Sequence, residues 1–207
     1  SYPYMNVDQT QYRFRMLGAS TARIWRLHFE DQTGKTVGHL RIGNDTWLNE
    51  KALPMTEFTL SMAQRADLIM DFSGIPTGTK VYLVNTADQT SGRGPGGTLD
   101  SLGKGGTFSE RIMQFVVGNP APQTSSLPKT VAGLADPYAG PTLRDNTPIV
   151  QSEIAKTRTF QFGRSGGQWV INQQGFDSHR SDNPQQLGDA EEWNLINGGG
   201  GWWHPIH

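Results

Sequence analysis

Short segments in which apolar and polar residues alternate constrain the fold of this chain more than any other feature. They recur along the sequence at residues 12–16, 25–29, 68–72, 160–162 and 193–195. Successive side chains of a β-strand point to opposite faces, so each segment predicts a strand with one buried face. The recurrence of so many short segments predicts a sheet protein.

Three further segments are continuously apolar, as in strands that are covered on both faces. They lie at residues 81–84, 112–117 and 169–171. Clusters of Gly, Pro, Ser and Thr separate the strand-like segments, and no stretch keeps a helical period for three turns. Many short strands with regular turns predict an all-β sandwich or barrel.

Proline content divides the chain. Residues 118–157 contain six of the twelve prolines and little apolar periodicity. Since loops of that length are unusual inside a compact domain, this stretch predicts an interdomain linker. The expected organisation is a first domain at 1–117, the linker at 118–157 and a second unit at 158–207. The second unit is small for an independent core, and we expect the 207 residues alone to be unstable or to self-associate.

Composition excludes several classes of protein. Charge is nearly balanced, with 18 basic and 19 acidic residues, so no basic footprint for nucleic acid is present. No apolar run is long enough to cross a bilayer. The chain has no cysteine, which excludes disulfides, thiol catalysis and iron–sulfur clusters within it.

Two motifs favour structural interpretations. Residues 92–97 match G-x-G-x-x-G, but no helix is expected after them and Pro95 lacks an amide hydrogen, so a surface loop is predicted. Asp189, Glu191 and Glu192 form an acidic cluster, for which the solvated start of a strand is favoured over acid–base catalysis.

Histidines give the one hint of chemistry. His28, His39 and His179 are scattered and favour surface or core positions. His204 and His207 stand three residues apart beside a proline, and imidazole binds copper, zinc, iron and nickel. Two imidazoles alone are weak support for a metal site, because three or four ligands are usual.

The residues around these two histidines resemble a known pattern. Residues 191–207 read EEWNLINGGGGWWHPIH, similar to E-x-W-x-x-x-N, a small-residue turn and H-P-x-H-x-H in the third domain of multicopper oxidases. The similarity is greatest to the bilirubin-oxidase-like branch. Segments that fit the same branch, in order, are residues 12–20, 61–68, 71–73, 112–117, 159–164 and 169–172.

This resemblance implies an internal fragment of a three-domain protein. The implied fold is a cupredoxin-like Greek-key β-sandwich or barrel. Residues 1–117 would be the middle domain without its first strand, and residues 158–207 the beginning of the last domain. The same resemblance implies a secreted or periplasmic protein.

The resemblance also implies roles for three residues. His204 matches the histidine that binds type 1 copper, and His207 matches a ligand of type 2 copper in the trinuclear type 2/type 3 cluster. Trp202 matches a tryptophan beside the type 1 site, near the approaching substrate. The two H-x-H pairs of the family's first domain and its final H-C-H segment are absent from this sequence. We therefore expect these 207 residues to be inactive alone.

The activity implied for the complete parent is oxidation of a reductant in one-electron steps at type 1 copper. Dioxygen is reduced to water at the trinuclear cluster. Phenols, aminophenols, bilirubin-like pyrroles and metal ions are the implied reductants. The implied partners are the remaining first and last cupredoxin domains of the parent, with neither nucleic acid nor a membrane span.

Two alternatives stay open at the level of sequence. The chain could be a copper-free cupredoxin-like module with a structural or interaction role, as the family's middle domains bind no copper. A two-domain protein resembling nitrite reductases fits less well, because E-x-W-x-x-x-N before H-P-x-H is typical of three-domain oxidases.

Overall fold

The computed structural model describes residues 2–96, 108–122, 142–145 and 147–207. Within these residues there is no α-helix, and therefore no helix long and apolar enough to cross a membrane. The chain divides into two compact units, Ser1–Asp145 and Asn146–Ile206. The all-β, cupredoxin-like class predicted from the sequence is confirmed.

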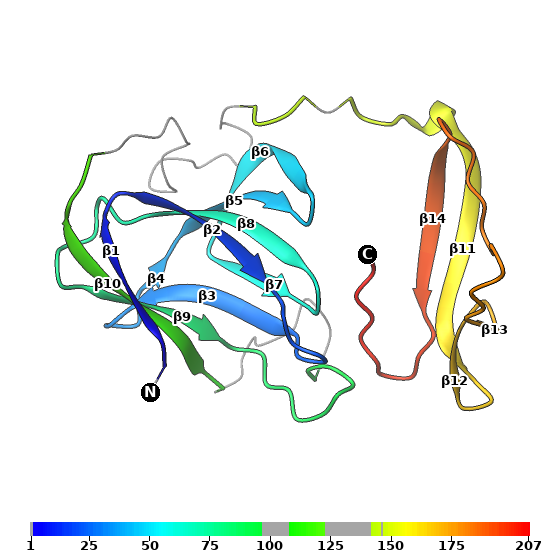
Figure 1. Cartoon of the computed structure of the whole chain (residues 1–207), viewed down its shortest axis with the longest axis horizontal. Coiled ribbons are helices and arrows are strands. Elements are labelled where there is room, and N and C mark those ends of the chain that lie inside the picture. The colour runs from blue at the N-terminus through cyan, green and yellow to red at the C-terminus, as the bar shows by residue number, and fades with distance from the viewer. Residues whose placement is uncertain (1, 97–107, 123–141, 146) are drawn as a thin grey trace. The chain divides into compact units, whose positions relative to one another are not determined.

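The first unit contains a six-stranded sheet (Figure 1). Its strand order is β1-β10-β9-β3-β4, and β7 also pairs with β3. β1 runs parallel to β10, whereas the other pairs are antiparallel. The bounds are Tyr4–Gln9 for β1, Trp25–Asp31 for β3, Thr36–Val37 for β4, Glu57–Leu60 for β7, Lys80–Asn85 for β9 and Glu110–Pro120 for β10.

A four-stranded antiparallel sheet forms the other layer of this unit. Its order is β2-β8-β5-β6, with β2 at Gln11–Leu17, β5 at His39–Asn44, β6 at Trp47–Met55 and β8 at Arg65–Asp71. Tyr12, Phe14 and Met16 pack against the core, while Arg13 and Arg15 are exposed. The predicted alternation is therefore confirmed in this strand.

The main core lies between the two sheets. It is built from the buried side chains Val7, Leu27, Phe29, Phe58, Leu60, Ala66, Leu68, Met70, Phe72, Val81, Leu83, Phe115 and Val117. A smaller cluster, comprising Leu40, Ile42, Ala52 and Ile69, is covered by Leu143. The main core thus covers one face of the second sheet, and the smaller cluster covers part of its outer face.

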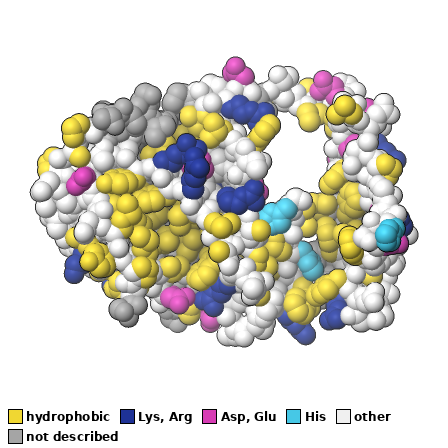
Figure 2. Space-filling model, viewed as in Figure 1, with side chains coloured by type: hydrophobic (Ala, Val, Ile, Leu, Met, Phe, Trp, Pro, Cys, Tyr) yellow, Lys and Arg dark blue, Asp and Glu magenta, His cyan; other side chains and the backbone are white. Residues whose placement is uncertain are grey.

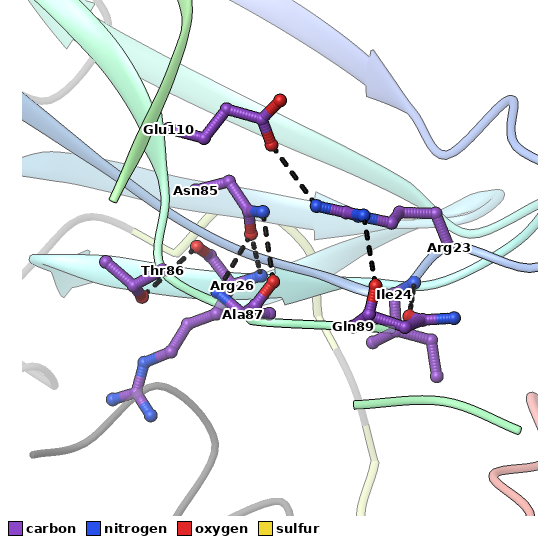
Figure 3. Close-up of polar contacts among 8 residues, drawn as sticks. All are labelled: Arg23, Ile24, Arg26, Asn85, Thr86, Ala87, Gln89 and Glu110. Atoms are coloured by element: carbon purple, nitrogen blue, oxygen red, sulfur yellow. Dashed lines mark hydrogen bonds and ion pairs between the residues drawn. The ribbon is translucent and has the colours of Figure 1, made fainter. Parts of the chain in front are cut away.

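A polar junction within this unit joins the end of β9 to the start of β3 (Figure 3). Asn85 is fully buried, and its side-chain oxygen accepts the backbone amides of Arg26 at 3.2 Å and Ala87 at 3.0 Å. Its side-chain nitrogen donates to the carbonyl of Ala87 at 3.2 Å. Gln89 continues the pattern by accepting the amide of Ile24 at 2.9 Å. These amide side chains replace ladder hydrogen bonds where regular pairing ends.

His39 is a core residue of the same unit. It is fully buried, and its ring lies edge-on to Phe29 at 5.4 Å and Phe58 at 5.3 Å between centroids. Neither ring nitrogen has a hydrogen-bond partner among the described residues. Burial, with a smaller contribution from the charge of Arg41, lowers the pKa of His39 to about 4. The imidazole is therefore neutral in the folded protein near pH 7.

The second unit is a single four-stranded sheet of order β13-β12-β11-β14 (Figure 1). The strands are Ile154–Ser165 (β11), Gln168–Ile171 (β12), Gln174–Gly175 (β13) and Ala190–Asn197 (β14), and a 3-10 helix, Gln151–Glu153 (η1), precedes β11. β11 and β14 are parallel neighbours. The expected linker, 118–157, contains residues 123–141 and 146 outside the described part, so its boundaries stay a prediction.

Candidate metal centre

The strand that leads to the two C-terminal histidines is anchored by an ion pair. Glu191 on β14 accepts two hydrogen bonds from Arg158 on β11, at 2.7 and 2.9 Å. It also accepts the indole N–H of Trp193 at 2.9 Å. These bonds, that from Arg158 first, lower the pKa of Glu191 to about 2. The E-x-W pattern thus places a carboxylate and an indole on the same face of β14.

The prediction of a solvated acidic strand start is wrong for one of its three residues. Asp189 and Glu192 are exposed as expected. The side chain of Glu191 is only 8% exposed, because Arg158 and Trp193 cover it. Its role is to hold β14 against β11.

Asn197 then shapes the turn that follows β14. Its side-chain oxygen accepts the amide of Gly199 at 3.0 Å, and its side-chain nitrogen donates to the carbonyl of Trp202 at 2.7 Å. Gly200 and Gly201 have φ angles of +63° and +88°, which favour glycine. The final Asn of E-x-W-x-x-x-N therefore fixes the conformation of the turn between β14 and Trp202.

Gly199 is needed because the imidazole of His204 approaches its backbone closely. A Cβ atom at this position would lie 2.9 Å from Nε2 of His204 and 3.2 Å from Oδ1 of Asn197. Real Cβ atoms do not approach other atoms so closely, so any side chain here would displace the ring. The absence of a side chain at Gly199 is thus a spatial requirement of the histidine.

The His204 ring is held between two aromatic side chains of the second unit. It stacks on Phe162 of β11, with centroids 5.8 Å apart and planes at 22°. Trp169 of β12 lies edge-on to it at 5.4 Å. Its Nε2 is buried and has no hydrogen-bond partner among the described residues. An oriented imidazole with an unused nitrogen is suited to bind a metal ion.

Trp202 joins the same aromatic group. Its ring lies edge-on to Trp169, with centroids 4.9 Å apart. A pocket of about 520 Å³ opens beside the group, and its lining includes Phe160, Phe162, Trp169 and His204. Trp169 therefore contacts both Trp202 and His204 and links the two side chains.

His207 is exposed. Within the described residues, no group of three or more His, Cys, Asp or Glu side chains is placed to hold a metal ion. His204 fits the part of one copper ligand, by its free nitrogen and its oriented ring. The described residues do not complete a centre by themselves.

Sequence patterns indicated His204, His207 and Trp202, but not the residues that orient them. Phe162 and Trp169 were predicted as strand residues in segments that fit the family pattern. Their contacts with His204 were not predicted, because these contacts join segments that are distant in the sequence. Gly199 and Asn197 belong to the quoted motif, and the spacing of that motif was the one available signal for them.

Comparisons with known proteins show what the chain is similar to. No protein-family model matches the chain. The chain is 33% identical over 213 residues to bilirubin oxidase of Albifimbria verrucaria, covering 100% of the chain and 33% of the relative. It is 29% identical to a laccase of Bacillus subtilis, covering 100% of the chain and 36% of the relative. The chain thus spans about a third of the length of these curated relatives.

Solved structures share the fold. The 2F4 variant of the McoA multicopper oxidase from Aquifex aeolicus superposes with a TM-score of 0.72 at 22% identity, over 99% of this chain and 42% of that one. The laccase-like multicopper oxidase CueO from Ochrobactrum sp. gives a TM-score of 0.68 at 20% identity, over 95% and 40%. By sequence and fold together, the chain belongs to the multicopper oxidase family.

Proposed function

We propose that this chain is the part of a multicopper oxidase that carries one ligand of the substrate-oxidising copper and one ligand of the oxygen-reducing cluster. His204 is assigned to type 1 copper and His207 to type 2 copper. The observation that carries the proposal is the His204 imidazole, which is clamped by Phe162 and Trp169 and keeps an unpartnered nitrogen.

Copper, when bound, would supply one-electron redox chemistry. The residues of this chain would hold the imidazole in place through Asn197, the glycine turn and the aromatic clamp. A type 1 centre also needs a thiolate and a second imidazole. Since the chain has no cysteine, the remaining copper ligands would come from the remaining first and last cupredoxin domains of the parent, and the 207 residues alone would be inactive.

The proposed reaction is oxidation of a small phenol, aminophenol, pyrrole or metal ion, with dioxygen reduced to water. Two relatives are named for bilirubin oxidation and as a laccase, which supports this class of reductant. Trp202 would border the approach of the reductant, since its ring contacts the side chain that clamps His204. A secreted or periplasmic location is proposed on the same family basis.

The test is copper content, measured by elemental analysis on the purified protein that carries this chain. We expect several copper ions per protein and a blue type 1 absorption band. His204→Ala should remove the blue band, while His207→Ala should leave it and alter the cluster's paramagnetic resonance. His179→Ala is the matched control, because His179 is an exposed histidine in the same unit as His204.

A copper content near zero in the purified protein would contradict the proposal and favour a copper-free module. Equal copper and equal spectra in the three variants would also contradict it, by showing that neither C-terminal histidine is a ligand. Circular dichroism of each variant separates loss of a ligand from loss of the fold.

A further inference from the structure

A second pocket lies in the first unit, on the outer face of the sheet that contains β2, β8, β5 and β6. Its volume is about 260 Å³. Figure 2 shows basic side chains, with acidic ones beside them, on the face of this unit that carries β2 and β8. The lining residues are Arg13, Arg15, Asn44, Asp45, Thr46, Trp47, Leu48, Arg65, Ala66 and Asp67. None of these residues belongs to the candidate metal centre.

The charges in this pocket do not balance. It contains three guanidinium groups and two carboxylates. Arg13 binds Asp67, with Nε donating to Oδ1 at 2.8 Å. Arg65 pairs with Asp45 at 3.2 Å. One positive charge is left over.

That charge belongs to Arg15. The backbone register places Arg15 directly opposite Asp67, yet the carboxylate of Asp67 is bound by Arg13 from two positions along the strand. Arg15 is exposed, and its side chain makes no hydrogen bond or ion pair with any residue in the described part of the chain. A guanidinium presents a planar fork of donors that fits a carboxylate with two parallel hydrogen bonds.

The other side of the pocket is aromatic. Trp47 begins β6, and its side chain is 63% exposed, which is unusual for a large apolar residue. The guanidinium of Arg144 lies 3.7 Å from the centroid of its ring. Stacking on one face holds the indole in place, so that the ring can offer area to a planar ligand.

The walls of the pocket are tied together before any ligand binds. The hairpin between β5 and β6 is linked to the start of β8 by two hydrogen bonds. The amide of Asp45 donates to the carbonyl of Arg65 at 3.1 Å, and the amide of Arg65 donates to the carboxylate of Asp45 at 3.0 Å. A site formed in advance loses little freedom on binding, which favours affinity.

We propose that this pocket binds a small aromatic carboxylate. Arg15 receives the carboxylate with its fork of donors, and the aromatic ring packs on Trp47. A volume of about 260 Å³ suits a single-ring compound, below the range of drug-sized sites. The ion pairs of Arg13 and Arg65 keep the other guanidiniums occupied, so that one carboxylate is bound.

The experiment is a titration of the full chain with benzoate. Binding is measured by calorimetry and by ¹H–¹⁵N spectra of the indole groups. Benzamide lacks the charge, cyclohexanecarboxylate lacks the aromatic ring, and inorganic phosphate lacks the ring while keeping the charge. We expect measurable binding of benzoate and at least tenfold weaker binding of each of the other three.

Three variants locate the site. Arg15→Gln should weaken benzoate binding at least tenfold, and Trp47→Leu should weaken it several-fold. Lys35→Gln removes the same charge from an exposed position outside the pocket, and it should bind benzoate as the unchanged chain does. Unfolding curves of the three variants show whether each remains folded.

Absence of benzoate binding at millimolar concentration would overturn the proposal. Equal losses in Arg15→Gln and Lys35→Gln would overturn it too, as would phosphate binding as tightly as benzoate, since both outcomes indicate general attraction of anions. None of these outcomes bears on copper content, so the two proposals fail independently.

Discussion

At the scale of single residues, the chain uses histidine in two opposite ways. His39 is buried between Phe29 and Phe58 with no polar partner, whereas His204 is oriented by rings and retains a nitrogen beside a glycine turn. The first arrangement disfavours the charged form of imidazole, because burial removes its hydration. The second leaves the ring available as a ligand.

The neutral state of His39 predicts acid sensitivity of the first unit. Its folded-state pKa of about 4 lies below the ordinary value of 6.5, so the unfolded chain binds a proton first as pH falls. The free energy of unfolding should be unaffected above pH 6.5 and should decrease from there down to about pH 4, by about 3 kcal/mol at most. Urea unfolding at several pH values measures this.

His39→Phe should flatten that pH dependence, because no proton then binds on unfolding. His179→Gln is the control, since His179 is exposed, and it should keep the dependence of the unchanged chain. Parallel stability curves for His39→Phe and the unchanged chain between pH 6.5 and 4 would contradict the assignment.

Gly199→Ala should displace the imidazole of His204, since a Cβ would come within 2.9 Å of its Nε2. The ring would lose its stacking on Phe162, and its proton resonances should move toward random-coil positions in histidine-labelled spectra. Gly163→Ala is the control, because a Cβ there meets nothing within 4 Å. Unchanged His204 resonances in Gly199→Ala would show that the turn adapts freely.

At the scale of elements, alternation predicted the strands that contribute most to the core, and it missed others. β2, β3 and β8 are confirmed as alternating strands, and β9 and β10 as strands predicted from continuous apolar runs. β6 was not foreseen, because Pro54 interrupts it and its residues follow no clear period. Proline is tolerated there because β6 lies at the edge of its sheet. The parallel pairings, β1 with β10 and β11 with β14, leave no local signal in the sequence.

The polar junction at the end of β9 yields a prediction for this scale. Asn85→Ala leaves the buried amides of Arg26 and Ala87 without their acceptor. We expect the free energy of unfolding to fall by about 2–4 kcal/mol. Asn6→Ala, at an exposed position of β1, should change it by less than about 0.5 kcal/mol. Equal effects of the two substitutions in urea unfolding would refute the role of Asn85.

At the scale of the whole molecule, the two units differ in how well they cover their apolar side chains. The first has a core between two sheets. In the second, Phe176 is 94% exposed and both Trp193 and Leu195 are 48% exposed. β14 is an edge strand of its sheet in the described part of the chain. The sequence indicated a weaker core in the second unit only through its small size.

The exposed edge predicts that the 207-residue chain self-associates, because unpaired strands with apolar side chains pair with other copies. Sedimentation velocity should show mass increasing with concentration. Leu195→Lys on β14 should lower this association, whereas Leu187→Lys, in a fully exposed loop position, should have a smaller effect. A monomer at all concentrations would count against this view of the second unit.

The parallel pairing of β11 with β14 also has a consequence for the order of events in folding. The two strands are joined only after the intervening residues 166–189 have closed a large loop, which is a slow, non-local step. Asn197 is the last residue of β14, and the glycine turn and His204 follow it in the chain. Until that loop closes, His204 lies in an unpaired segment, and Phe162 and Trp169 do not yet orient its ring. The copper binding proposed for His204 is thus expected only after β11 and β14 have paired. Copper added before that step would find histidine side chains without a fixed orientation.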